Sequence, residues 1–185
     1  GVSMLLNALR SEPHALETAY LSVITFESVA KQVIPLTDLI SFQEPILNAG
    51  GATALGGALE LLSRKLDSEI IKNTPDQKGD WRPLDFLMTD GQPTDDWQNG
   101  AEEIRKRNAK IVACAAGFNV DASKLKQITD IVLQLQSTSA NDISKFFEWV
   151  TASITARSYR VNTGGDDTAG FGELPPPPKE LIIVA

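Results

Sequence analysis

Two short loops of this sequence carry oxygen-bearing side chains that suit a hard divalent cation. Thr53 follows a glycine pair and precedes an apolar segment with helical spacing, so its hydroxyl is expected at the start of a helix. Asp90 comes directly after an apolar, strand-like run. Hydroxyl, carboxylate and water oxygens, without His or Cys, are the ligands that Mg²⁺ or Mn²⁺ prefers. Thr53 and Asp90 are therefore the candidate metal ligands.

Four neighbours of Asp90 could support these ligands from outside the coordination sphere, namely Thr89, Gly91, Asp95 and Asp96. Each has an ordinary structural explanation as well. An Asp-Gly pair is typical of a turn, and acidic residues favour the positive end of a following helix. Thr53 itself could serve only as a helix cap. Spacing alone leaves both interpretations open.

The elements that would position these residues alternate between strands and helices. We expect strands at 18–26, 31–36, 84–88, 110–116 and 130–135, the first buried on both faces and the second at an edge because it contains Pro35. We expect helices at 2–10, 54–66, 97–108 and 141–156, and a short one capped by Asp121 or Ser123. This alternation is typical of an α/β fold with a doubly wound, mostly parallel sheet and helices on both faces. Ligands of such sheets bind at the carboxyl ends of the strands.

Composition excludes several classes of function. The 185 residues include 17 Lys and Arg against 24 Asp and Glu, and the resulting net charge of −7 disfavours a nucleic-acid binder. Mean hydropathy is −0.10, and no apolar run is long enough for a membrane helix. The single cysteine, Cys114, excludes an intrachain disulfide and is expected to be a small buried hydrophobe. His14 is the only histidine in the sequence, so multi-histidine metal sites are excluded too.

Two tryptophans, Trp81 and Trp97, lie in the segments before and after the candidate Asp90 strand. Tryptophan is a frequent anchor of protein partners, so both are candidate partner-binding residues. They could equally cover the end of the sheet.

Longer motifs give a family resemblance. They are residues 15–26 (ALETAYLSVITF), 53–56 (TALG), 79–84 (GDWRPL), 86–97 (FLMTDGQPTDDW), 113–117 (ACAAG) and 173–178 (ELPPPP). With these motifs the chain resembles a von Willebrand factor A (VWA) domain of the bacterial tellurite-resistance TerY type, over nearly its whole length. The resemblance implies a Rossmann-like α/β fold.

The resemblance also implies a metal-ion-dependent adhesion site (MIDAS) built from three loops. Thr53 matches the threonine of the second loop and Asp90 the aspartate of the third. The Asp-x-Ser-x-Ser motif of the first loop is absent, and Ser3 lies in the helix that would follow it. We therefore expect a VWA-like domain at 1–157 that lacks the first, central strand and the first metal loop. Since Mg²⁺ takes six ligands, this chain should bind it weakly and an extended version should bind it well.

The function implied is a non-enzymatic protein-binding module whose cation accepts a carboxylate from a protein partner. The TerY resemblance suggests a cytoplasmic role in bacterial stress and tellurite resistance, beside a protein kinase and a metal-dependent phosphatase. The alternative is a Mg²⁺-dependent hydrolase of phosphoesters that uses Asp90, Asp95 and Asp96. That alternative lacks a credible nucleophile or general base.

A Gly/Pro-rich tail is expected from residue 158 to 185, flexible and with a stiff run of prolines at 175–178. It closes on the strand-like residues 181–185 (LIIVA). We hypothesise that this run, or a neighbouring chain, fills the central gap in the sheet. The alternative is that it is a short tail or docking peptide.

Overall fold

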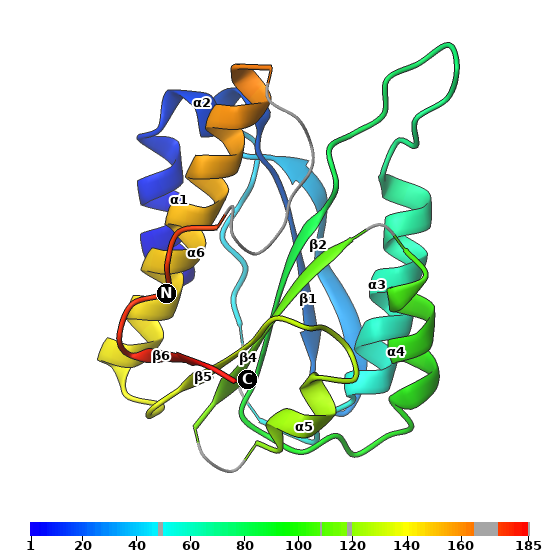
Figure 1. Ribbon diagram of the computed structural model, residues 1–185, viewed down its shortest axis with the longest axis vertical. Helices are drawn as coiled ribbons and strands as arrows, with labels where there is room; N and C mark the ends of the chain where they lie inside the picture. Colours follow the sequence, from blue (N-terminus) through cyan, green and yellow to red (C-terminus); the bar gives the residue numbers. More distant parts are fainter. Residues whose placement is uncertain (48–49, 108, 118–119, 165–173, 185) are drawn as a thin grey trace.

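Helices cover both faces of a layer of strands in the computed structural model of the chain (Figure 1). The structure describes residues 1–185 except 48–49, 108, 118–119, 165–173 and 185. The helices are α1 (Val2–Arg10), α2 (Pro13–Thr18), α3 (Leu55–Glu69), α4 (Gln98–Arg105), α5 (Ala122–Leu125) and α6 (Ala140–Asn162). The strands are β1 (Tyr20–Phe26), β2 (Ala30–Asp38), β3 (Leu84–Thr89), β4 (Lys110–Ala116), β5 (Val132–Leu135) and β6 (Leu181–Ile183).

The strands form two separate hydrogen-bonded groups. In one, β1 and β2 pair antiparallel, and in the other the order is β3-β4-β5-β6. Within the second group β3, β4 and β5 are parallel, whereas β6 runs antiparallel to β5. The predicted α/β class with a mostly parallel sheet and helices on both faces is therefore confirmed.

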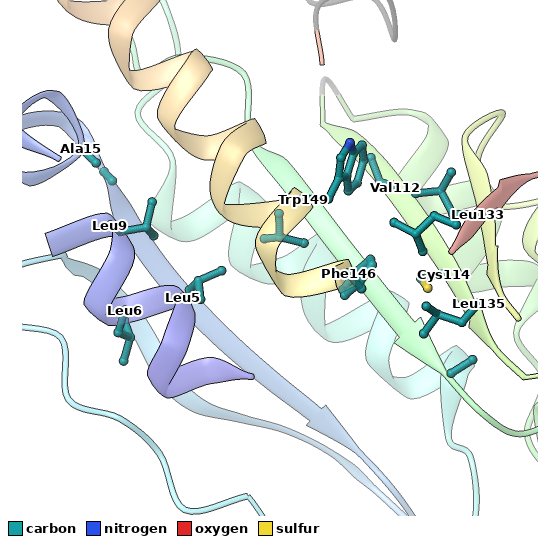
Figure 2. Packing of buried hydrophobic residues seen from close by; sticks show 14 of the residues in the cluster. Leu5, Leu6, Leu9, Ala15, Val112, Cys114, Leu133, Leu135, Phe146 and Trp149 are labelled. Carbon is teal, nitrogen blue, oxygen red and sulfur yellow. The ribbon is translucent and has the colours of Figure 1, made fainter. Parts of the chain in front are cut away.

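One core lies between the strands and the helices α1, α2 and α6. Figure 2 shows Leu5 and Leu9 of α1, and Phe146 and Trp149 of α6, on the same side of the sheet as Cys114. Phe86 of β3 meets the rings of Phe146 and Trp149 edge to face, with ring centroids 6.4 and 6.0 Å away. Such edge-to-face pairs stabilise a core beyond the area that they bury.

Cys114 lies on β4 within this core and is fully buried, as predicted. Burial raises the pKa of its thiol to about 12. A second core lies on the opposite face, where α3, α4 and α5 pack against the sheet with Leu55, Leu59, Ile104 and Leu125. Every residue of β4 is buried, because this strand lies between β3 and β5 with helices on both faces.

Most of the expected helices and strands are present, with small shifts of their ends. The Asp121 carboxylate caps α5 by accepting the Ser123 N–H at 3.0 Å. Helix α2 was not predicted, since its six residues are too few for a clear helical pattern. The prediction that β1 is buried on both faces is wrong, because Tyr20 is 61% exposed and the rest of the strand is at most half-buried.

The C-terminal segment also differs from expectation. Helix α6 continues to Asn162, beyond the expected boundary between 157 and 158. Residues 165–173, part of the tail expected to be flexible, lie outside the described residues. Further on, the Trp149 Nε1–H donates to the Pro175 carbonyl at 2.8 Å, which fixes the proline run to α6.

The position of β6 overturns the hypothesis that the final run fills a central gap. Leu181 pairs with Leu135, so β6 covers the outer edge of β5. Figure 1 shows β6 beside β5, near the start of α6. None of the helices in the described part of the chain is both long and apolar enough to cross a membrane.

Candidate metal-binding site

The two loops that carry Thr53 and Asp90 are held together by backbone contacts. Thr53 donates its N–H to Thr94 Oγ1 at 3.2 Å, and the Thr94 N–H donates to the Thr53 carbonyl at 3.0 Å. Gly91 lies so close that a Cβ placed on it would be 2.5 Å from Thr53 Oγ1. The structure therefore brings Thr53 next to the Asp90 turn, at the carboxyl end of β3.

The turn around Asp90 is organised by the residue before it. Thr89 is 6% exposed, and its hydroxyl lies 3.4 Å from the Gly91 nitrogen and 3.3 Å from the Gly91 oxygen. These contacts close a short turn with Asp90 at its tip, and Asp90 is exposed to solvent. Thr89 thus supports the position of Asp90 from beneath, while its own hydroxyl is engaged within the turn.

Asp95 caps a helix that belongs to the other loop. Its Oδ1 accepts the Gly56 N–H and its Oδ2 accepts the Gly57 N–H, both at 2.9 Å. Helix α3 has no cap from its own N-cap residue, Ala54, so Asp95 satisfies N–H groups that the helix leaves unpaired. Asp95 therefore stabilises the start of a helix, which is the structural explanation given for it above. The helix is α3, however, and not α4, which follows Asp95 in the sequence.

Asp96 caps the next helix, α4. Its Oδ1 lies 3.3 Å from the Gln98 nitrogen and its Oδ2 lies 3.4 Å from Asn99 Nδ2. Both Asp95 and Asp96 are therefore engaged with helix starts. Of the candidate residues named from the sequence, Thr53 with its hydroxyl and Asp90 with its carboxylate are left as possible cation ligands.

The two tryptophans lie in different surroundings. Trp97 is 6% exposed and packs in the core under α3 and α4, which agrees with the explanation that it covers the sheet. Trp81 precedes β3 whereas Asp90 follows it, so a strand of six residues, about 20 Å long, separates them. Trp81 packs instead under Arg157, whose guanidinium carbon lies 5.8 Å from the ring centroid. Neither ring flanks the candidate site at the surface.

Sequence reasoning missed one contributor to this site, Thr94, which clamps the loops through its backbone and hydroxyl. Gly91, one of the four supporting residues expected from the sequence, provides the close approach to Thr53. The sequence signal for Thr94 lies in the run from Thr89 to Thr94. Gly91 and Pro93 indicate a turn there, and the threonine hydroxyls on both sides of it form hydrogen bonds with backbone groups.

The chemistry of the donors suits a hard cation, but their number is small. In the described residues no three His, Cys, Asp or Glu side chains gather to hold a metal. His14 lies on α2, with its Nδ1 2.7 Å from Asn162 Nδ2, away from the Asp90 turn. Thr53 and Asp90 could fill two of the six positions that Mg²⁺ requires.

An α/β layer with Thr and Asp loops at the carboxyl end of its strands defines a class of ligand-binding domains. Within that class, the model of the von Willebrand factor type A domain matches residues 2–149, and the chain belongs to this family. Domains of this family mediate protein–protein interactions, and their MIDAS motifs bind divalent cations. No curated protein sequence gives a significant match to the chain.

The solved structures that are similar to this chain include two different proteins. Proximal thread matrix protein 1 from the mussel byssus has a TM-score of 0.64 at 19% identity, over 81% of this chain and 41% of its own. The conserved hypothetical protein BatB from Bacteroides thetaiotaomicron has a TM-score of 0.51 at 18% identity, over 84% and 85%. One structure of the mussel protein (TM-score 0.52, 20% identity, 85% of this chain and 40% of its own) has a zinc-occupied MIDAS motif. These likenesses show the fold, and the chain spans about two fifths of the mussel protein.

Proposed function

We propose that this chain is a non-enzymatic protein-binding module whose partner contact runs through a divalent cation held by Thr53 and Asp90. The observation that carries the proposal is the backbone clamp between Thr53 and Thr94, which keeps the hydroxyl beside the exposed Asp90 turn. A cation there would accept a carboxylate from a partner protein as a further ligand. The geometry places these oxygen donors side by side at the carboxyl end of β3.

We propose Mg²⁺ or Mn²⁺ as the cation, because a hydroxyl and a carboxylate are hard oxygen ligands. With two protein ligands the remaining positions would be held by water, so binding by this chain is weak. The Asp-x-Ser-x-Ser motif expected from the family resemblance would raise the number of protein oxygens at the site.

The proposed biological setting is that of the TerY-like VWA proteins. The support is the run 86–97 (FLMTDGQPTDDW) together with the prolines at 175–178. In this setting the module would be cytoplasmic, act in bacterial stress and tellurite resistance, and bind a protein kinase and a metal-dependent phosphatase.

The hydrolase alternative receives less support. It requires Asp90, Asp95 and Asp96 around one cation, yet Asp95 is engaged with Gly56 and Gly57, and Asp96 with α4. A phosphoester hydrolase would also need a residue that activates water near Asp90.

Calorimetric titration with MnCl₂ and MgCl₂ tests the site. Wild type is expected to bind in the millimolar range, with Asp90→Asn and Thr53→Val each abolishing the measurable heat. Asp96→Asn is the matched control, since it neutralises an acid in the same loop that is engaged with α4. Unchanged binding in Asp90→Asn, or an equal loss in Asp96→Asn, would overturn the assignment.

A second experiment separates the module from the hydrolase. A chain lengthened before Gly1 with a strand and an Asp-x-Ser-x-Ser loop is expected to bind Mg²⁺ much more tightly than the 185-residue chain. In that longer chain Asp90→Ala should lose capture of the kinase and the phosphatase, with no turnover of p-nitrophenyl phosphate in either form. Equal affinity of the two chains would contradict the first expectation, and turnover abolished by Asp90→Ala would favour the hydrolase.

A further inference from the structure

A cavity of about 510 Å³ lies at the end of the sheet opposite the candidate cation site. Its walls come from the end of α3, the end of α4 and the connection between α3 and β3, which projects beyond α3 (Figure 1). The described residues that line it lie between Leu66 and Ala109, and Pro83 among them precedes β3, whereas Asp90 follows β3. Cavities of this size are typical of small-molecule sites in proteins.

The apolar part of the lining continues the second core. Leu66 belongs to that core, and Ile70 and Ala109 pack against it. Ile71, a further lining residue, is 50% exposed. Apolar surface that stays in contact with water costs free energy, so the apolar body of a ligand that covers this surface would gain affinity from it.

Hydrogen bonds fix the segment 71–80, which forms one wall of the cavity. The Ile71 N–H donates to Asp80 Oδ2 at 2.8 Å, and the Asp80 N–H donates to the Ile71 carbonyl at 2.9 Å. The Gly79 N–H donates to Asn73 Oδ1 at 2.7 Å, and a Cβ on Gly79 would lie 2.5 Å from the Ile71 carbonyl oxygen. The segment is therefore folded closely back on itself, and a wall that is already ordered lowers the cost of binding a ligand.

Basic side chains are in excess in this cavity. Four of the lining residues are basic and three are acidic, whereas the whole chain has 17 basic against 24 acidic residues. The basic residues are Lys72, Arg82, Lys106 and Arg107, and the acidic ones are Asp67, Asp80 and Glu103. The cavity thus reverses the charge balance of the chain, and this favours an anionic ligand.

Arg107 holds two of the acidic side chains. Its Nη2 donates to Asp67 Oδ2 at 2.6 Å, and its Nη1 lies 3.3 Å from Glu103 Oε2. Hydrogen bonds from Arg107 and Lys72 lower the pKa of the Asp67 carboxyl, and those from Lys106 and Arg107 lower the pKa of Glu103. Three basic side chains therefore serve these two carboxylates.

Lys72 and Lys106 present their charges to solvent. Their side chains are 71% and 65% exposed, and they pair with Asp67 at 3.3 Å and with Glu103 at 2.6 Å. Exposed pairs of this kind contribute little free energy, so a ligand anion can take over the lysines while Arg107 keeps the two carboxylates. The Arg107 side chain is only 22% exposed, which suits this fixed role.

We propose that this cavity binds a small organic anion, whose apolar body covers Ile70, Ile71 and Ala109 and whose anionic group bonds to Lys72 and Lys106. An inorganic anion would leave the apolar lining in contact with water, and an uncharged apolar molecule would make no use of the lysines. A cation would meet carboxylates that already have basic partners. The site does not depend on a cation at Thr53 and Asp90, so either assignment can fail without the other.

Fluorescence titration with two dyes tests the proposal. Anilinonaphthalene sulfonate carries one anionic group on an apolar ring system, and phenylnaphthylamine has the same rings without that group. Wild type is expected to bind the sulfonate about tenfold more tightly, since two exposed charge contacts are together worth about that ratio. Equal affinity for the two dyes, tighter binding of the neutral dye, or no binding of either would overturn the proposal.

Variants of the two lysines assign the preference to this cavity. Lys72→Gln combined with Lys106→Gln should remove the preference and leave the affinity for the neutral dye unchanged. Lys145→Gln is the matched control, because Lys145 of α6 forms a pair of the same kind with Glu148, at 2.7 Å. A preference that persists in the double variant, or that is lost equally in Lys145→Gln, would contradict the assignment.

Amide chemical shifts locate the sulfonate on the chain. The largest changes are expected at Ile71, Arg107 and Ala109, and largest changes at amides outside residues 66–109 would overturn the proposal. Ala109→Phe should abolish binding of both dyes in the cavity, because the larger side chain fills it. Urea denaturation shows whether that variant folds, and the lysine variants, which change exposed side chains, decide the question if it does not.

Discussion

Asp95 Oδ1 accepts the backbone N–H of Gly56 at 2.9 Å, so the loop that follows β3 caps the first turn of α3. Gly56 lies three residues after Thr53, and Asp95 lies five residues after Asp90. This one bond therefore connects the two loops that carry the candidate ligands. The position of Thr53 relative to Asp90 therefore depends in part on this hydrogen bond between Asp95 and Gly56, neither of which is a candidate ligand.

Asp95→Ala should lower the free energy of unfolding by about 1–2 kcal/mol, as expected for a lost helix cap. Urea denaturation measures the effect. Asp96→Ala is the control, and its loss should be smaller because its bonds to Gln98 and Asn99 are longer, at 3.3 and 3.4 Å. Equal losses in the two variants would contradict the role given to Asp95.

Gly56→Ala should destabilise the fold by about 2 kcal/mol or more, because overpacking against fixed backbone cannot relax cheaply. The added Cβ would lie 2.2 Å from the Asp96 carbonyl oxygen. Gly57→Ala is a matched control in the same helix turn, since the nearest atom to its Cβ would be Ala30 Cβ at 3.6 Å. That variant should keep or slightly raise the melting temperature through better helix propensity.

Gly91→Ala should weaken Mn²⁺ binding while changing the melting temperature little. The added Cβ would lie 2.5 Å from Thr53 Oγ1, and the threonine can rotate its hydroxyl away at small cost. Calorimetric titration and thermal melting of the same sample separate the two effects. Unaltered Mn²⁺ affinity would mean that the Thr53 hydroxyl does not contact the cation.

The Asp85 carboxyl should make stability depend on pH between about 4 and 7. Its pKa is raised from 3.8 to about 7 in the folded chain by burial, so the folded state keeps a proton that the unfolded state releases in this window. The free energy of unfolding therefore falls as pH rises from 4 to 7, by on the order of 4 kcal/mol at most, and this contribution stays constant above 7.

Asp85→Asn should flatten this pH profile in urea denaturation series run from pH 4 to 8. Asp80→Asn is a suitable control because Asp80 lies outside β3, in the loop that precedes it, where its Oδ2 accepts the Ile71 N–H. A profile of the same slope in wild type and Asp85→Asn would assign the dependence to other groups.

Local patterns predicted the elements of the fold well. Apolar residues at positions 2, 5, 6 and 9 indicated α1, and the small apolar run 110–116 indicated the buried strand β4. The alternation of strands and helices also indicated that Thr53 and the Asp90 turn would lie at the same end of the sheet. In the structure they do, and Gly91 lies against Thr53 there. These features depend on short-range periodicity and on general rules of α/β topology.

The features that could not be predicted depend on contacts between distant segments. Asp95 caps α3 across 39 positions in the sequence, and β6 pairs with β5 after a long connection. The burial of Trp97 follows from the close packing of α3 on α4, which no local pattern encodes. The Asp85 Oδ2 oxygen has no hydrogen-bond partner in the part of the chain that the structure describes, and this can be seen only once its surroundings are known.

Cys114 gives the protein an internal probe of its own motions. The molecule carries one thiol, placed under α6 on the central strand β4, where reagents cannot reach it in the closed state. Labelling by a thiol reagent therefore requires the α6 side of the core to open, and its rate measures how often that happens.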